Sequence, residues 1–192
     1  MSGRSLLSII VLAAAAAALS DEVVWDYDLT SLPDGWSLDG HNSEWTFSPD
    51  GAHMQASASS PYSTAYAIIY TDAITIPAGC DSVVFHVEQD LQRYASGTGW
   101  SAALVHYRIN GMIWKELYDG PYQSTNPIHC RIPVFEGNIM EVRIQGTAVA
   151  GSDIHPGSGS INWLLWDLTL TLYGDEVGLD NSTWAAIKLF QQ

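Results

Sequence analysis

The sequence predicts an all-β sandwich of two antiparallel sheets, and three observations support this prediction. No segment between residues 21 and 174 repeats its apolar residues with the 3.6-residue period of a long helix. Short runs rich in β-branched and aromatic residues recur there, separated by Gly, Pro, Asn, Asp and Ser. The dipeptide Asn110-Gly111 separates two such runs. Because a tight hairpin turn needs positive φ at both central residues, this dipeptide predicts a hairpin.

The runs predict a series of strands along the chain. In order they are residues 23–29, 44–48, 52–58, 65–71, 82–91, 100–109, 112–118, 128–133, 139–147 and 161–173. The last run is the most regular, since from Trp166 to Leu172 apolar residues alternate with Asp and Thr. This alternation predicts one face in the core and one polar face.

Strand direction predicts where the connections lie, because strands joined by antiparallel connections alternate between the two ends of a sandwich. Counted in this way, the mature N-terminus and Gly174 share one end with the short turns. An extra strand at residues 74–77 would reverse the count for everything before it. The longer segments are predicted to gather at the other end, and they are residues 30–43, 59–64, 92–99, 119–127 and 148–160.

The N-terminal segment predicts export. Residues 1–20 hold a single cation at Arg4, then an apolar run, then small residues before Asp21, as in a secretory signal peptide. Its removal leaves six Lys and Arg against 21 Asp and Glu, a formal net charge of −15. Nucleic acid and anionic lipid are therefore not expected as partners, and no membrane span is expected after signal removal. The mature protein is expected to be secreted or held at the cell surface.

Cys80 and Cys130 are the two cysteines of the chain. In an exported protein they are candidates for a disulfide, which would stabilise the fold by roughly 4 kcal/mol in the chain-entropy model. Two free buried thiols are the alternative, because the sequence does not give the distance between them. We expect the disulfide.

Several segments resemble a known group of domains: DLTSLPDGW, EWTFSPDG, LVHYRINGMIWKEL and WDLTLTLYG. They are similar to bacterial secreted jelly-roll domains of the choice-of-anchor and cleaved-adhesin type, and distantly to MAM domains. The resemblance spans residues 23–174 and implies a two-sheet jelly roll used for adhesion or glycan binding, sometimes with a structural Ca²⁺ ion. Asp167 stands alone where such domains often have paired acidic residues, so we expect no cofactor beyond a possible structural Ca²⁺ ion.

Motifs typical of enzymes are missing from the chain. It has no GxSxG, HExxH, P-loop or CxxC motif and no ExDxxE spacing, so the sequence predicts a protein that is not an enzyme. His86, Glu88 and Asp90 share one face of a predicted strand. They form either a metal- or sugar-binding patch or a solvated outer face, and strand alternation favours the solvated face.

Aromatic residues point to a binding site among the long segments. The chain has eight Trp and nine Tyr. Core packing accounts for those on strands, such as Trp25, Trp114 and Trp166. Sugar recognition needs flat aromatic faces and planar polar groups, and the long segments carry both. Tethering of loops is the alternative role for these side chains. The predicted ligand-binding residues are Trp36, Tyr94, Trp100, Tyr122, Asn126, Asp153 and His155.

Residues 175–192 predict a linker and a short amphipathic helix, with Trp184, Ile187 and Phe190 at three-residue steps and Lys188 beside them. A helix this short is marginal alone, so it packs on its own domain or binds cell-surface or sorting machinery.

Together these observations predict that residues 21–174 are an exported binding or adhesion domain for carbohydrate or another surface polymer. The alternatives are a structural subunit of an extracellular layer or fibre, and a divergent glycoside hydrolase or lyase.

Overall fold

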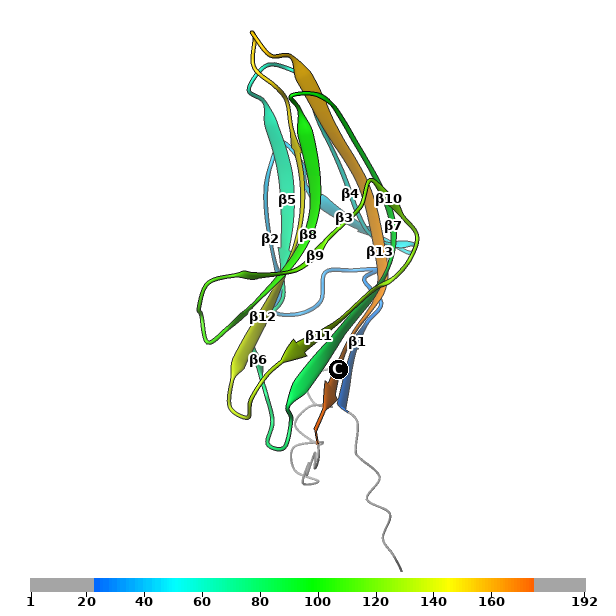
Figure 1. Ribbon diagram of the computed structural model, residues 1–192. Helices are drawn as coiled ribbons and strands as arrows, with labels where there is room; N and C mark the ends of the chain where they lie inside the picture. Colours follow the sequence, from blue (N-terminus) through cyan, green and yellow to red (C-terminus); the bar gives the residue numbers. More distant parts are fainter. Residues whose placement is uncertain (1–22, 175–192) are drawn as a thin grey trace, which may run out of the picture.

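The computed structural model describes residues 23–174, in which thirteen strands form two antiparallel sheets (Figure 1). The strands are β1 (Val23–Tyr27), β2 (Ser37–His41), β3 (Trp45–Ser48), β4 (Gly51–Ala58), β5 (Thr64–Tyr70), β6 (Ile74–Thr75), β7 (Ser82–Gly97), β8 (Trp100–Ile109), β9 (Lys115–Asp119), β10 (Gln123–Ser124), β11 (Ile128–Pro133), β12 (Ile139–Val149) and β13 (Gly157–Tyr173). The predicted all-β fold with two antiparallel sheets is confirmed for these residues. The predicted signal peptide and C-terminal tail lie outside them.

The first sheet has the order β10-β7-β13-β4-β3, with β1 also paired to β13 and β11 also paired to β7. The second sheet has the order β2-β5-β12-β8-β9, with β6 also paired to β12. Residues 23–174 contain no helix long and apolar enough to cross a membrane.

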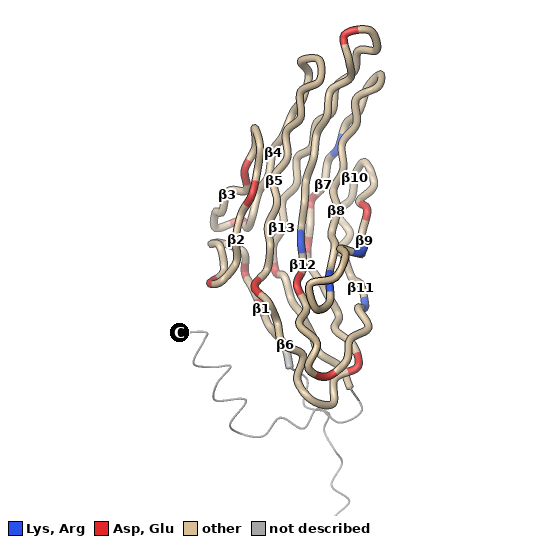
Figure 2. The backbone as a smooth tube through the Cα atoms, turned by 90° about the vertical axis from the view of Figure 1, so that its left-hand side faces the viewer, with Lys and Arg blue, Asp and Glu red and all other residues tan. Residues whose placement is uncertain are grey.

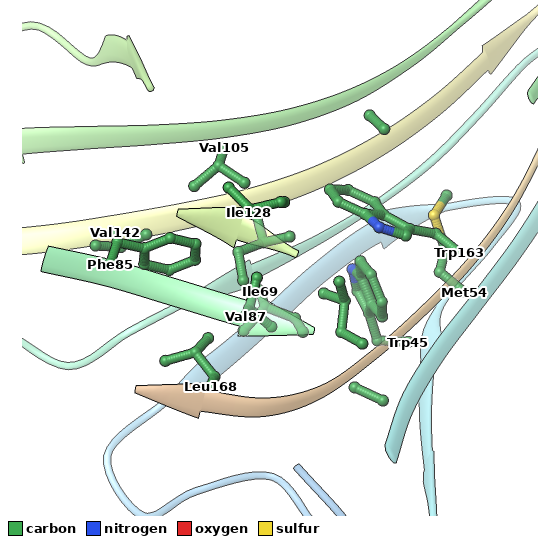
Figure 3. Packing of buried hydrophobic residues seen from close by; sticks show 14 of the residues in the cluster. Trp45, Met54, Ile69, Phe85, Val87, Val105, Ile128, Val142, Trp163 and Leu168 are labelled. Atoms are coloured by element: carbon green, nitrogen blue, oxygen red, sulfur yellow. The ribbon is translucent and has the colours of Figure 1, made fainter. Parts of the chain in front are cut away.

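The core fills the space between the sheets (Figure 3). Phe85 and Val87 of β7 and Trp163 of β13 enter it from the first sheet, and Ile69 and Val142 enter it from the second. Each of these strands alternates buried and more exposed residues over most of its length, as a sheet with one covered face requires. Outward side chains are therefore free to face solvent or a ligand.

The strand predictions hold for most of the chain. The bounds predicted for β8 and β11 are those observed, and residues 74–75 form the short β6. β8 and β9 form the predicted hairpin, and φ is 52° at Asn110 and 67° at Gly111, but β9 begins at Lys115, so residues 110–114 connect the strands instead of a two-residue turn. β2 and β10 were not predicted, because β2 is exposed at all five positions and β10 has only two residues.

The last strand departs from its predicted alternation at a β-bulge. The register between β13 and β7 shifts between Trp166 and Thr169, and Asp167 lies inside the shift with φ of 49°. Leu168 and Leu170 remain in the core, whereas Trp166 is partly exposed and is not among the core residues. The inserted residue reverses the facing of the strand on its N-terminal side. The prediction that Trp166 packs in the core was wrong for this reason.

The predicted distribution of chain ends and long segments between the two ends of the sandwich is correct in part. Val23 pairs with Leu172, so the start of β1 lies beside the end of β13 at one end of the sandwich. We call the opposite end, where β4 connects to β5, β7 to β8 and β12 to β13, the tip (top of Figure 1). At the tip, Tyr62 donates a backbone hydrogen bond to Gly151 and Thr98 donates one to Pro156. Three of the predicted long segments therefore meet there, namely 59–64, 92–99 and 148–160.

The other two long segments lie mostly away from the tip, although Asn42 Nδ2 at the end of one of them donates a hydrogen bond to the backbone oxygen of Thr64. Segment 30–43 contains β2, whose Ser37 pairs with Tyr70 at the far end of β5. Segment 119–127 contains β10, whose Gln123 pairs with Gln92 partway along β7. Both segments run along the side of the sandwich, because each contains a strand that the prediction treated as loop.

Candidate functional site

The seven residues predicted to bind a ligand are spread over the molecule. Trp36 is only 7% exposed and packs against Tyr27, with ring centroids 4.8 Å apart. Its place in the core rules it out as a ligand contact in this fold. Tyr94 is 58% exposed on the outer face of the first sheet, whereas Trp100 is 49% exposed on the outer face of the second. These two aromatic side chains therefore point to opposite sides of the sandwich.

Tyr122 and Asn126 lie at the edge of the sandwich, where their contacts are internal. The guanidinium carbon of Arg93 lies 5.2 Å from the centroid of the Tyr122 ring, and Arg93 Nη1 is 3.3 Å from Asp119 Oδ1. The backbone oxygen of Asn126 accepts a hydrogen bond of 2.8 Å from Gln89 Nε2. Both contacts tether segment 119–127 to the sandwich.

Asp153 and His155 are exposed in the loop between β12 and β13 at the tip. The loop closes on itself, since His155 N donates to Ser152 Oγ at 3.0 Å and Ser152 N donates to the oxygen of His155 at 2.9 Å. The chains pack closely here, and a Cβ added to Gly99 would lie 2.4 Å from the nitrogen of Ser158. The tip is therefore a narrow closed loop, and the predicted residues do not form one site.

The outer face of the second sheet brings aromatic and planar polar side chains together. On β5, Ala67 and Ile69 belong to the core, so Tyr66 and Tyr70 point outward and are partly exposed. Register places Tyr66 opposite Thr147 and Tyr70 opposite Arg143. We call this surface the second-sheet face and define it by Tyr66, Tyr70, Leu104, Trp114, Arg143 and Gln145.

Trp114 is the centre of a cluster at the end of this face that is away from the tip. The guanidinium carbons of Arg108 and Arg143 lie 4.6 Å and 4.9 Å from the centroid of its ring, and the Tyr70 ring lies 6.1 Å away. Figure 2 views the molecule from this side and shows Lys and Arg positions of β8, β9 and β12 near one another. A cation over an indole ring is an attractive contact. These contacts fix the orientation of the indole on the outside of the sheet.

The two arginines differ in their other partners. Arg108 donates two hydrogen bonds of 2.6 Å to the carboxylate of Glu141, and these raise the pKa of its guanidinium. Arg143 has no ion pair within residues 23–174, and its Nε is buried without a hydrogen-bond partner there. Burial, followed by the charge of Arg143, lowers the pKa of His106. Among the described residues, the Arg143 guanidinium on the second-sheet face thus has no carboxylate partner.

The prediction that Trp114 packs in the core was wrong, because the strand resumes later than expected. β9 begins at Lys115, and residues 110–114 form a connection that projects beyond the second sheet (Figure 1). Met112 and Ile113 are strongly exposed in this connection, whereas Trp114 turns onto the sheet. The sequence gives no signal for this, since a run of apolar residues after Asn-Gly is also what a strand looks like.

The outer face of the first sheet is more polar. His86, Glu88 and Asp90 are partly exposed on it, where the predicted solvated face would place them. Further along the sheet, His53 Nε2 lies 2.5 Å from Asn162 Oδ1, and Tyr94 is the strongly exposed aromatic side chain. Ser160 of β13 lies opposite Tyr94, and Trp166, which the bulge turns outward, is six residues further along β13, about 20 Å away, so this face is a weaker candidate for ring stacking.

A pocket of about 340 Å³ beside β1 bears on the possible calcium ion. Asp26, Asp28 and Asp167 are among its lining residues. The carboxylate of Asp28 already accepts two hydrogen bonds of 3.0 Å from Thr30. Within residues 23–174 no group of three His, Cys, Asp or Glu side chains is arranged to hold a metal ion. The described residues therefore give no support for the structural Ca²⁺ ion that the resemblance allowed.

The predicted disulfide is absent, and both thiols are free. In the pairing of β11 with β7, Ser82 lies opposite Pro133 and Phe85 lies opposite Cys130. Cys130 therefore lies level with a position on β7 that is three residues, or about 10 Å, beyond Ser82. Cys80 precedes Ser82, so it lies still further from Cys130. A disulfide needs Cα atoms within about 7 Å. Burial raises the pKa of both thiols.

Comparisons with known proteins give distant similarities. No protein-family model and no curated protein matches the chain. Among solved structures, the chain is similar to a family 29 carbohydrate-binding module from Piromyces equi, with 10% identity, a TM-score of 0.45 and coverage of 83% of this chain and 96% of the module. It is also similar to the K3 cleaved adhesin domain of Lys-gingipain from Porphyromonas gingivalis, with 14% identity, a TM-score of 0.40 and coverage of 78% and 99%.

A third similar structure is the mannan-recognising carbohydrate-binding module TmCBM27, with 13% identity, a TM-score of 0.32 and coverage of 79% of this chain and 98% of the module. Identities and TM-scores this low leave the function to be argued from the residues of this chain.

Proposed function

We propose that residues 21–174 are an exported, non-enzymatic binding or adhesion domain for carbohydrate or another surface polymer, and that the second-sheet face holds the ligand. The observation that supports this most strongly is the position of Trp114, held by Arg108 and Arg143 on the outside of a sheet. The phenol rings of Tyr66 and Tyr70 offer flat apolar surfaces to the C–H side of a pyranose, and planar polar groups such as the guanidinium of Arg143, which lies over Trp114, bind its hydroxyls.

The spacing of the rings favours an extended ligand. Tyr66 and Tyr70 are four residues apart on β5, which is about 13 Å along a strand. Gln145 lies opposite Ile68, between the two tyrosines, and Arg143 lies opposite Tyr70. A short oligosaccharide laid along β5 would meet a ring, then an amide, then a second ring beside a guanidinium.

Arg143 is the side chain with most hydrogen-bonding capacity for such a ligand. A guanidinium has five N–H donors, and no carboxylate within residues 23–174 forms an ion pair with this one. Hydroxyl or carboxyl oxygens of a sugar would supply the missing acceptors. Glu141, the carboxylate beside the cluster, is already held in two hydrogen bonds by Arg108 and is poorly placed to act as a general acid or base.

The chain ends fit the same proposal. Residues 1–20 serve as the signal peptide, and residues 175–192 serve as an attachment or sorting tail that binds cell-surface machinery. Gly174 follows β13 at the end of the sandwich where β1 begins, opposite the tip. A tail bound there would leave the second-sheet face free for a polymer.

A structural subunit of an extracellular layer is the second candidate, favoured by exposed apolar side chains in the β8–β9 connection. Ile113 is 86% exposed and Met112 is also strongly exposed. Side chains of this kind often mark a protein contact. Sedimentation of the mature chain at rising concentration separates the candidates, because a subunit assembles and a binding domain stays monomeric.

A glycan-array screen of residues 21–192 tests the proposed function. We expect saturable binding to one class of sugar, and we expect the Trp114→Ala variant to lose at least tenfold in affinity. Tyr94→Ala is the matched control, since it removes an exposed ring from the opposite sheet and should bind like the wild type. Absence of binding to every glycan and polymer tested would contradict the proposal, as would equal binding by wild type and Trp114→Ala.

A further inference from the structure

Two histidines face each other on the outer face of the first sheet. His86 of β7 pairs directly with His129 of β11, and their Nδ1 atoms are 3.4 Å apart. The ring centroids are 5.6 Å apart and the planes meet at 69°. His86 is partly exposed and His129 is exposed. This pair lies on the opposite side of the sandwich from the second-sheet face and is independent of it.

A neighbouring carboxylate favours one tautomer of His86. Glu88 Oε1 lies 3.4 Å from His86 Nε2. A carboxylate beside an imidazole nitrogen favours a proton on that nitrogen, which leaves a lone pair on Nδ1, the atom that faces His129. Carboxylates orient metal-bound histidines in the same way, by accepting the N–H of the ring nitrogen that is not coordinated.

The separation of the two Nδ1 atoms suits a tetrahedral metal ion. Zinc binds imidazole nitrogen at about 2.0–2.1 Å, so an ion bonded to two atoms 3.4 Å apart would subtend an angle of about 110° between them. This is close to the tetrahedral angle. The separation therefore allows one ion to bind both imidazoles.

The surroundings favour a cation at this position. On β13, the residue opposite His86 is the neutral Thr169. Arg131, two positions from His129 on β11, is paired with Asp81 at 3.3 Å. The mature chain also has a formal net charge of −15 by its sequence, which raises the local concentration of cations.

We propose that His86 and His129 form a two-imidazole site for a divalent transition-metal ion of the Zn²⁺ class, with Glu88 as the residue that positions His86. Because residues 23–174 offer no group of three ligating side chains, water or an external ligand completes the coordination. The ion would join β11 to β7. In its absence, one Nδ1–H donates to the other Nδ1.

Calorimetric titration of the metal-free mature chain with ZnCl₂ tests this site. We expect one saturable equivalent, and we expect His86→Gln and His129→Gln each to weaken binding by at least tenfold. Glu88→Gln should weaken it by about tenfold, the lower bound for loss of an outer partner. His155→Gln, which removes an exposed histidine at the tip, is the matched control and should leave the affinity unchanged.

Imidazole NMR signals give a second measurement that does not depend on the variants. Those of His86 and His129 should shift together on adding one equivalent of ZnCl₂, while that of His155 should not. The site is ruled out by the absence of saturable binding, by unchanged affinity in both histidine variants, or by zinc shifts confined to other histidines.

Discussion

Trp163 Nε1 donates a hydrogen bond of 3.0 Å to Oε1 of Gln89, within the buried face of the first sheet. The amide nitrogen of Gln89 in turn donates to Tyr118 Oη at 2.9 Å and to the backbone oxygen of Asn126 at 2.8 Å. One buried amide therefore links β13, β9 and the segment before β11. Buried polar groups without partners are costly, so this amide stabilises the fold by satisfying three neighbours at once.

Replacement of Gln89 by Leu should lower the free energy of unfolding by about 2 to 4 kcal/mol, because Trp163 Nε1 would lose its partner and the backbone oxygen of Asn126 would keep the longer hydrogen bond of 3.4 Å from Ser124 Oγ. Urea denaturation measures the change. Gln92→Leu is the control, since Gln92 is exposed on the same strand, and it should change stability by less than about 0.5 kcal/mol. Equal effects of the two substitutions would show that the hydrogen bonds of Gln89 do not contribute to the free energy of unfolding.

His106 should make stability depend on pH. Its pKa in the folded protein is lowered, first by burial and then by Arg143, so the unfolded chain takes up its proton more readily. The contribution of neutral His106 to the free energy of unfolding is fully present above the unfolded pKa of about 6.5, and it is lost as the pH falls below that value. Between pH 7.5 and 5.5 the melting temperature of the wild type should therefore fall further than that of His106→Gln. Parallel curves would contradict this origin.

The two cysteines should be reactive without reductant. Because both thiols are free, mass spectrometry of the chain unfolded in denaturant should find Cys80 and Cys130 alkylated. In the folded protein both should react slowly, since burial raises the pKa of each thiol and lowers the fraction of thiolate. A mass two protons lower, with no alkylation until reductant is added, would mean that the pair is bonded.

Deletion of residues 175–192 tests the proposed attachment tail. We expect an unchanged melting temperature and loss of the protein from the cell surface into the medium. Trp184→Ala in the full chain should have the same effect without changing the length of the chain. A large loss of stability with normal retention at the surface would instead place the tail on its own domain.

The regular parts of the fold follow from sequence patterns, and the exceptions have physical causes. The hairpin at Asn110 was predictable because its turn restricts the residues that fit. The bulge at Asp167 was not, since it depends on how β13 meets β7 and leaves the residue types unchanged. Gln89 was overlooked as a core residue because a polar side chain is buried only when distant partners satisfy it.

The candidate site was less predictable than the fold. Tyr66 and Tyr70 alternate with core residues as any half-buried strand does, and nothing in their sequence marks the outer face as a binding surface. Trp36 sits in a segment that looks like loop, yet Tyr27 and the core enclose it. Which aromatic residues are exposed depends on how distant strands pair, and local sequence patterns do not reveal that pairing.

The most direct test of the second-sheet face is NMR mapping of the mature chain with an oligosaccharide of the class found in the glycan screen. We predict shifts at Tyr66, Tyr70, Trp114 and the backbone of Arg143 and Gln145, with Tyr94, Asp153 and His155 unchanged. Shifts confined to Tyr94 or to the tip, with the second-sheet face unaffected, would contradict the proposed site.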